Sequence, residues 1–160
     1  MSHTSFQWPL VRVATVDDAD AAARVLRQSI IHLCQLDYAD QPGRLEQWLA
    51  NKTSSHVQNW ISQDGFTLYV AEQERGIVGV GGLNNQGIIQ LNYVDPHWRL
   101  RGVSSALLLE METSAREAGN SNTTLESTRT AERFYRARGY NTLAAQQAPR
   151  DGLWLTKALT

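Results

Sequence analysis

Residues 94–112, VDPHWRLRGVSSALLLEME, contain the sharpest change of pattern in the sequence. An apolar, strand-like run is stopped by Asp95-Pro96, and a helical run begins directly after Gly102. The first turn of such a helix has free N–H groups and the positive end of the helix dipole, and both favour a phosphate. Gly102 leaves the backbone open to an anion, and Arg99 and Arg101 add positive charge. The stretch predicts a phosphate-binding turn; the alternative is a helix start with solvated arginines.

The segments on either side of this turn predict a single domain over residues 1–160, with residues 1–8 as a loose N-terminal segment. Period-two patterns predict strands at 10–14, 66–73, 76–83, 87–94, 122–127 and 152–159, and a short one at 140–142. Helical spacing predicts helices at 19–31, 103–118 and 130–138, and two between 45 and 61 that are separated near 53–55. This order predicts a mixed α/β sheet, because short turns such as those between 66 and 94 join antiparallel strands.

The composition is typical of a soluble globular protein, since 42% of the 160 residues are apolar and 19% are charged. No apolar run reaches the length of a membrane span, and the opening MSHTSFQWPL lacks the regions of a signal peptide. Cys34 is the single cysteine, so no internal disulfide is expected. We therefore expect a cytoplasmic protein with no membrane contact.

The charges are unevenly distributed along the chain. Residues 1–95 carry six Lys/Arg and ten Asp/Glu, a net charge of −4, whereas residues 96–160 carry nine and six, a net charge of +3. This asymmetry suggests an anionic ligand on one side and a cationic one on the other, or an uneven surface without function. The overall net charge of −1 argues against a nucleic-acid partner.

Other apparent motifs fail on their context. GVGGLN at 79–84 is followed by another strand rather than a helix, so its glycines indicate a bulge or a close backbone approach instead of a dinucleotide loop. The four histidines and Cys34 show no metal-ligand spacing, and no metal is expected. A triad of Ser29, His32 and Asp37 would lie along one short helix with nothing to form an oxyanion hole.

Two segments together resemble the GNAT superfamily of N-acetyltransferases. In YVDPHWRLRGVSSALL, Arg99 matches the Gln/Arg of the acyl-CoA-binding motif Q/R-x-x-G-x-G/A, and Gly102 matches its first glycine. Ser104 stands where glycine or alanine is usual. The element order of this family fits from about residue 10 to residue 159, which implies a mostly antiparallel central sheet, flanked by helices and splayed at the strands that bind CoA.

The second segment is TRTAERFYRARGY, which resembles N-x-x-A-x-x-F-Y-x-x-x-G-F of the same family. Four positions match, and two differ: Thr128 replaces the asparagine and Tyr140 replaces the last phenylalanine. The matching residues are Ala131, Phe134, Tyr135 and Gly139. Thr128 cannot reproduce the two-sided amide contact of an asparagine, and Ser104 adds a hydroxyl to the turn, so both departures bear on CoA affinity.

The resemblance implies acetyl-CoA as the cofactor and assigns roles to individual residues. The N–H groups from Arg101 to Ser105 would bind the CoA diphosphate, the end of the 88–94 strand would pair with the pantetheine arm, and Tyr135 would protonate the departing thiolate. A tyrosine, with an ordinary pKa near 10, can donate without prior ionisation. The expected cofactor-binding residues are Asn92, Tyr93, Val94, Arg99, Arg101, Gly102, Val103, Ser104, Ser105, Thr128, Ala131 and Phe134.

Transfer to an amine also needs a base, because the attacking nitrogen must be neutral. Glu126 and Glu72 are the candidates by chemistry, and Glu126 is preferred beside the expected cleft. By analogy of fold, Cys34, Asp37 and Tyr38 after the first helix would line the acceptor pocket, where Asp37 and Asp40 could attract a cationic amine.

The leading hypothesis is therefore direct transfer of an acetyl group from acetyl-CoA to a primary amine of a small molecule or peptide. The alternative, which Ser104 and Thr128 would permit, is a CoA-binding sensor or assembly domain of weak or no activity. Trp8, Trp48, Trp60 and Trp98 are many large apolar groups for a small core, which favours a homodimer. No motif identifies the acceptor.

Overall fold

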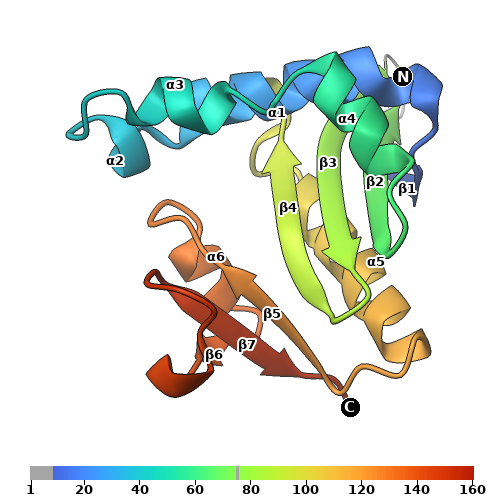
Figure 1. Ribbon diagram of the computed structural model, residues 1–160. Coiled ribbons are helices and arrows are strands. Elements are labelled where there is room, and N and C mark those ends of the chain that lie inside the picture. The colour runs from blue at the N-terminus through green and yellow to red at the C-terminus, as the bar shows by residue number, and fades with distance from the viewer. Residues whose placement is uncertain (1–8, 75) are drawn as a thin grey trace, which may run out of the picture.

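The computed structural model describes residues 9–74 and 76–160, which form one mixed sheet with helices on both faces (Figure 1). The strands are β1 (Leu10–Val13), β2 (Phe66–Gln73), β3 (Gly76–Asn84), β4 (Ile88–Val94), β5 (Asn122–Glu126), β6 (Asn141–Thr142) and β7 (Trp154–Ala158). The helices are α1 (Ala19–Leu33), α2 (Gln35–Tyr38), α3 (Arg44–Leu49), α4 (Ser54–Ile61), α5 (Val103–Glu117) and α6 (Glu132–Arg136), with 3₁₀ turns η1 (Val16–Asp18), η2 (Pro96–Trp98) and η3 (Ala145–Gln147).

The strand order is β1-β2-β3-β4-β5-β7-β6, and every neighbouring pair is antiparallel except β4 and β5. Alternate residues of the central strands point to opposite faces. Val70 and Val80 belong to the core under α1 and α4, whereas Tyr69 and Ala71 belong to the core under α5. The expected α/β fold with a mostly antiparallel sheet is confirmed.

Helix α5 lies unusually close to β3 because two glycines of that strand face it. A Cβ atom at Gly79 would lie 2.5 Å from Cγ1 of Val103, and one at Gly81 would lie 3.1 Å from Met111. Real Cβ atoms do not come as close as the first of these distances, so the helix could not pack there against alanine. The close backbone approach expected from GVGGLN is confirmed, and it seats the start of α5 directly against the sheet.

A β-bulge in β4 determines where the sheet opens. Gly82 is opposite Leu91 and Leu83 is opposite Ile89, so Gln90 is an extra residue with no partner in β3. A bulge of this kind bends its strand and increases the local twist. On its other edge, β4 pairs with β5 only at Ile88 and Ile89. From Gln90 onward the two strands separate, and Figure 1 shows β5 and β7 turned away from β4. The expected splay is confirmed.

A buried polar cluster fastens the far part of the sheet to α5. Glu112 of α5 is 6% exposed, accepts a 2.8 Å hydrogen bond from the Tyr140 hydroxyl, and lies 3.1 Å from Nζ of Lys157 on β7. Thr123 of β5 is 2.8 Å from the same hydroxyl. Tyr140, which replaces the family's phenylalanine, therefore has partners for its polar atom, as a buried hydroxyl requires.

The predicted boundaries differ from the observed ones mainly in short elements. The expected break near 53–55 is confirmed, because Thr53 caps α4 by accepting a 3.2 Å hydrogen bond from the His56 N–H. Helix α2 was not predicted, and the helix expected at 130–138 is limited to Glu132–Arg136. The segment 1–8 expected to be loose lies outside the described residues. Within residues 9–74 and 76–160, no helix combines the length and apolarity needed to cross a bilayer.

We predict that Glu112→Gln lowers the free energy of unfolding by about 1–3 kcal/mol, because it removes the ion pair with Lys157 and a charged acceptor from a buried cluster. Glu110→Gln is the matched control, since Glu110 lies on the same helix and is exposed. Urea unfolding of both variants measures the difference. Equal stabilities would contradict an energetic role for the cluster.

Candidate active site

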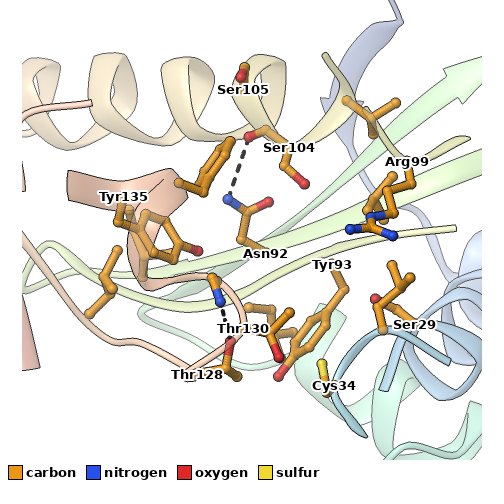
Figure 2. Close-up of a pocket in the computed structure, with 18 of the residues that line it drawn as sticks. Ser29, Cys34, Asn92, Tyr93, Arg99, Ser104, Ser105, Thr128, Thr130 and Tyr135 are labelled. Carbon is orange, nitrogen blue, oxygen red and sulfur yellow. Dashed lines mark hydrogen bonds between the residues drawn. The ribbon is translucent and has the colours of Figure 1, made fainter. Parts of the chain in front are cut away.

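A cavity of about 480 Å³ lies where β4 leaves β5, between the start of α5 and the segment that leads into α6 (Figure 2). We call it the first cavity. Most residues expected to contact the cofactor or the reaction line it: Asn92, Tyr93, Val94, Arg99, Gly102, Val103, Ser104, Ser105, Glu126, Thr128, Ala131, Phe134 and Tyr135. Arg101 does not, since its guanidinium lies over the Trp98 ring at 5.1 Å from the centroid.

The turn before α5 holds two residues in the left-handed region. Gly102 has φ of +83°, as its position before the helix requires, and Leu100 has φ of +63° although it is not glycine. Such strain in a side-chain-bearing residue is concentrated at functional sites. Among the described residues, no backbone hydrogen bond engages the N–H groups of Arg101 and Gly102. The first helical residues that follow have N–H groups without helical partners, so a row of donors faces outward at this point.

Tyr135 lies buried at the inner end of the first cavity. Its ring packs edge-on against Phe134 at 5.1 Å and Tyr140 at 5.6 Å between centroids. Burial raises the pKa of Tyr135 to about 12, with the Asn92 side chain acting in the opposite direction. The hydroxyl points toward Asn92 (Figure 2). It therefore remains a proton-bearing donor at any physiological pH.

Asn92 supplies the complementary acceptor. Its Nδ2 donates a 3.4 Å hydrogen bond to the carbonyl of Ser104, which ties β4 to the first turn of α5. Its Oδ1 is buried and has no hydrogen-bond partner among the described residues. A buried polar atom of this kind is costly unless something binds to it. Asn92 thus brings an unpaired acceptor to the wall of the cavity between the turn at Gly102 and Tyr135.

The two departures from the family motif have local explanations. Thr128 accepts a 3.1 Å hydrogen bond at Oγ1 from the Ala131 N–H, so it caps the turn that begins α6. Ser104 lies in the first turn of α5 with its hydroxyl directed into the cavity in Figure 2. Neither side chain fills the space between β4 and α5. They alter polar contacts rather than close the site.

Arg138 is a residue of the first cavity that the sequence analysis did not assign to it. Its Nε and Nη2 donate to Oγ of Ser105 at 3.1 and 2.8 Å, and its guanidinium lies 3.7 Å from the Phe134 ring centroid. These contacts hold a cation above the start of α5. The spacing of four residues between Phe134 and Arg138 was the available signal, but arginines on a helix surface are too common for it to be decisive.

A second cavity, of about 1120 Å³, lies on the other side of the opening between α3, the start of the loop after β5, and the segment 149–154. It shares wall residues with the first cavity: Ile89, Gln90, Tyr93, Glu126 and Thr128. Glu126 stands on this shared wall, where Oε2 pairs with Arg150. The two cavities therefore meet where β4 and β5 separate.

The three residues expected to bind the acceptor are divided among different environments. Cys34 lines the first cavity and is buried, which raises the pKa of its thiol to about 12. Asp37 lines the second cavity, but its carboxylate binds the segment 129–130. The Tyr38 hydroxyl donates to the carbonyl of Ile31 and the residue lines neither cavity. With Asp37 held there, no triad with Ser29 and His32 is assembled.

A sheet that opens beside a helix N-terminus, with a buried tyrosine at the opening, suits a ligand with phosphates at one end and a long extended arm. The chain belongs to the GNAT acetyltransferase family, since residues 27–157 match the model of the acetyltransferase (GNAT) domain. No curated protein matches the sequence.

Solved structures confirm the GNAT fold over nearly the whole chain. A GCN5-related N-acetyltransferase from Rhodopseudomonas palustris is 25% identical, with a TM-score of 0.81 over 99% of this chain and 100% of that one. PaiA N-acetyltransferase from Thermoplasma acidophilum, solved with coenzyme A, is 17% identical, with a TM-score of 0.79 over 95% and 99%. N-acetylglutamate synthase from Neisseria gonorrhoeae, solved with coenzyme A and N-acetyl-glutamate, is 18% identical, with a TM-score of 0.71 over 96% of this chain and 36% of that one.

We predict that Tyr135 ionises only near pH 12 in the folded protein. Its folded-state pKa lies above the ordinary value near 10, so the folded state retains a proton that the unfolded state loses. The stabilisation from this group is complete below pH 10 and is lost as the pH rises through 12. Absorbance titration at the tyrosinate band should show the same rise for wild type and Tyr135→Phe up to about pH 11. A smaller rise for the variant below that pH would contradict the assignment.

Proposed function

We propose that the protein transfers an acetyl group from acetyl-CoA directly to a primary amine of a small molecule or peptide. The observation that carries this proposal is the meeting of two cavities at the opening of β4 and β5. A donor that enters from the first cavity and an acceptor that enters from the second would come together beside Gln90 and Glu126. Such an arrangement converts an encounter of two molecules into a reaction within one complex.

The residues of the first cavity fit CoA along its length. The N–H groups at the start of α5 would bind the diphosphate, with Arg99 and Arg138 adding positive charge nearby. The edge of β4 beyond Ile89 has no strand beside it, so its peptide groups are available to an extended arm that carries amides. Oδ1 of Asn92 would accept from one of those amide N–H groups.

Tyr135 would act on the leaving group. A thiol has an ordinary pKa near 8.5, lower than that of Tyr135, but the same burial also disfavours a naked thiolate. A protonated phenol beside the sulfur therefore donates a hydrogen bond as negative charge develops and can pass its proton on as the bond to the acetyl carbon breaks.

We predict that Tyr135→Phe lowers kcat by about a hundredfold, the usual scale for loss of a general acid. The dissociation constant for CoA should change little, because the phosphate-binding turn is untouched. Thiol-release kinetics and calorimetric titration with CoA measure the two effects. Full turnover would exclude Tyr135 as the acid. If the wild-type protein binds CoA but no amine gives turnover, the result would instead favour a CoA-binding sensor.

Glu126 is the proposed base on the acceptor side. Its pairing with Arg150 holds the carboxylate on the wall that both cavities share, with Oε1 next to Gly152. From there it can take the proton of an incoming ammonium group, directly or through water. Glu72, the other candidate by chemistry, instead pairs with Arg12 at 2.8 Å on β1 and lines neither cavity.

We predict that Glu126→Gln lowers kcat/KM at pH 7 by tenfold or more and that the loss shrinks as the pH is raised to about 10, where free amine becomes abundant. Glu132→Gln is the matched control, because Glu132 pairs with Arg136 outside both cavities. A pH–rate profile that is the same for Glu126→Gln and wild type would exclude Glu126.

A homodimer and a cytoplasmic location remain proposals from the sequence. The homodimer was expected from the tryptophans. Three of these are covered within the chain, since Arg44, Lys52 and Arg101 lie over the rings of Trp48, Trp60 and Trp98. Trp8 lies outside the described residues. Support for self-association comes instead from the edge strand β1, whose apolar residues Leu10 and Val13 are exposed.

A further inference from the structure

The charged side chains that line the second cavity differ in what they are bound to. Its wall contains three acidic residues, Asp37, Glu126 and Asp151, and three arginines, Arg44, Arg129 and Arg150. Counted as formal charges they cancel. Which of these groups are available to a ligand depends on which of them already have partners.

Two of the three carboxylates are engaged. Asp37 accepts from the backbone N–H of Arg129 at 2.6 Å, from that of Thr130 at 3.4 Å, and from the Thr130 hydroxyl at 2.7 Å. Glu126 forms the ion pair with Arg150. Of the acidic residues on this wall, only Asp151 has no partner within the described chain.

Two of the three arginines, by contrast, have no carboxylate partner within residues 9–74 and 76–160. The Arg44 guanidinium lies over the Trp48 ring at 5.2 Å from the centroid, which leaves its N–H edge free. Arg129 uses its backbone N–H to bind Asp37, while its exposed side chain has no ion-pair partner in the part of the chain that the structure describes. The two arginines come from α3 and from the loop after β5, on different walls of the second cavity.

Trp154 is a buried residue of the same wall with an unpaired donor. The residue is 5% exposed and belongs to the wall of the second cavity, and its indole N–H has no hydrogen-bond acceptor among the described residues. An indole can only donate, so its partner must be an acceptor. Among the charged side chains of this wall, those without a partner in the described chain are two arginines and one aspartate.

We propose that the acceptor is an amino acid, whose carboxylate is bound by Arg44 and Arg129 in the second cavity while its amine points to Glu126. This proposal rests on the proposed function. Guanidinium groups match carboxylates in charge and in geometry, and a flat pair of N–H donors can bind both oxygens. The unpaired Asp151 favours the ammonium end of the same molecule.

A polyamine or another purely cationic amine fits this cavity less well. Binding two or more ammonium groups requires several carboxylates with free oxygens. Of the three present, Glu126 is paired with Arg150, and the oxygens of Asp37 already accept three hydrogen bonds. Such a ligand would also leave Arg44 and Arg129 facing positive charge. Their repulsion would act against binding throughout the cavity.

The test compares acceptors that differ only in the carboxylate. The twenty amino acids and their α-amides are screened for acetyl-CoA-dependent thiol release, with putrescine and cadaverine as cationic amines. We expect at least one amino acid to react with kcat/KM at least tenfold above that of its amide. Arg44→Gln and Arg129→Gln should each raise KM for that amino acid by about threefold to fivefold, a modest loss because both side chains are exposed. The KM for acetyl-CoA should not change.

Two variants control for the change in net charge. Arg116→Gln and Arg133→Gln remove an exposed arginine from α5 and α6, and neither residue lines either cavity. They should leave the KM for the amino acid unchanged. If they raise it as much as the cavity variants do, the effect is one of overall charge and the proposed carboxylate site is wrong.

Other outcomes separate this inference from the proposed function. A preference for amides, putrescine or cadaverine would overturn the inference and leave the acetyltransferase proposal standing. If no amine releases thiol although CoA binds, the proposed function fails, and calorimetric titration of the same amino acids and amides into the protein–CoA complex decides the inference. Binding of an amino acid but not of its amide would support it, and binding of neither would overturn it.

Discussion

The structure depends on strand β4, which is hydrogen-bonded to a neighbouring strand along one edge but along only part of the other edge. β4 is paired with β3 along its length, apart from the bulge at Gln90, whereas its pairing with β5 stops after Ile89. Unpaired peptide groups inside a fold are costly, so an opening of this kind persists only where it is supported and where something uses the exposed edge. Both cavities are consequences of this separation.

Support for the opening comes from contacts with α5 rather than from hydrogen bonds between β4 and β5. Gly79 and Gly81 allow α5 to pack closely against β3, and this packing fixes the position of the α5 N-terminus relative to β4. Asn92 then ties β4 to that N-terminus through the Ser104 carbonyl. On the far side, Glu112 joins α5 to Tyr140 and Lys157. Helix α5 thus holds both parts of the sheet at a fixed separation. Residues of a functional site need such a rigid support if they are to be positioned precisely.

The sequence was sufficient for the parts of the molecule that local rules govern. Strand and helix patterns, the turn at Gly102 and the packing role of Gly79 each follow from a short window of residues, and they were confirmed. The resemblance to the GNAT family supplied the order of the elements and the splay. The extra residue at Gln90 could not be located, because a bulge depends on the register between two strands and no residue type marks it.

The site was less predictable where it depends on which partner a side chain finds. Arg138 reaches the first cavity only because α6 and α5 lie together, and Arg101 turns away from it to cover Trp98. Asp37 was expected to attract a cationic amine, a role that the structure leaves untested. Its carboxylate instead accepts three hydrogen bonds from residues more than ninety positions later in the chain. Such pairings arise from tertiary structure, which composition and spacing do not encode.

The same reasoning explains why formal charge is a poor guide to the ligand of a cavity. The sequence places an excess of acid before residue 96 and an excess of base after it. In the folded chain, Asp37 from the first part binds the loop that carries Arg129 from the second part. The Asp37 carboxylate is then occupied by hydrogen bonds, while the Arg129 guanidinium remains free. Hydrogen bonds from backbone N–H groups occupy the oxygens of an acid without using up any basic side chain. A wall with equal numbers of acidic and basic residues can therefore offer more free guanidinium groups than free carboxylate oxygens. The ligand preference of the second cavity follows from its hydrogen bonds rather than from its composition.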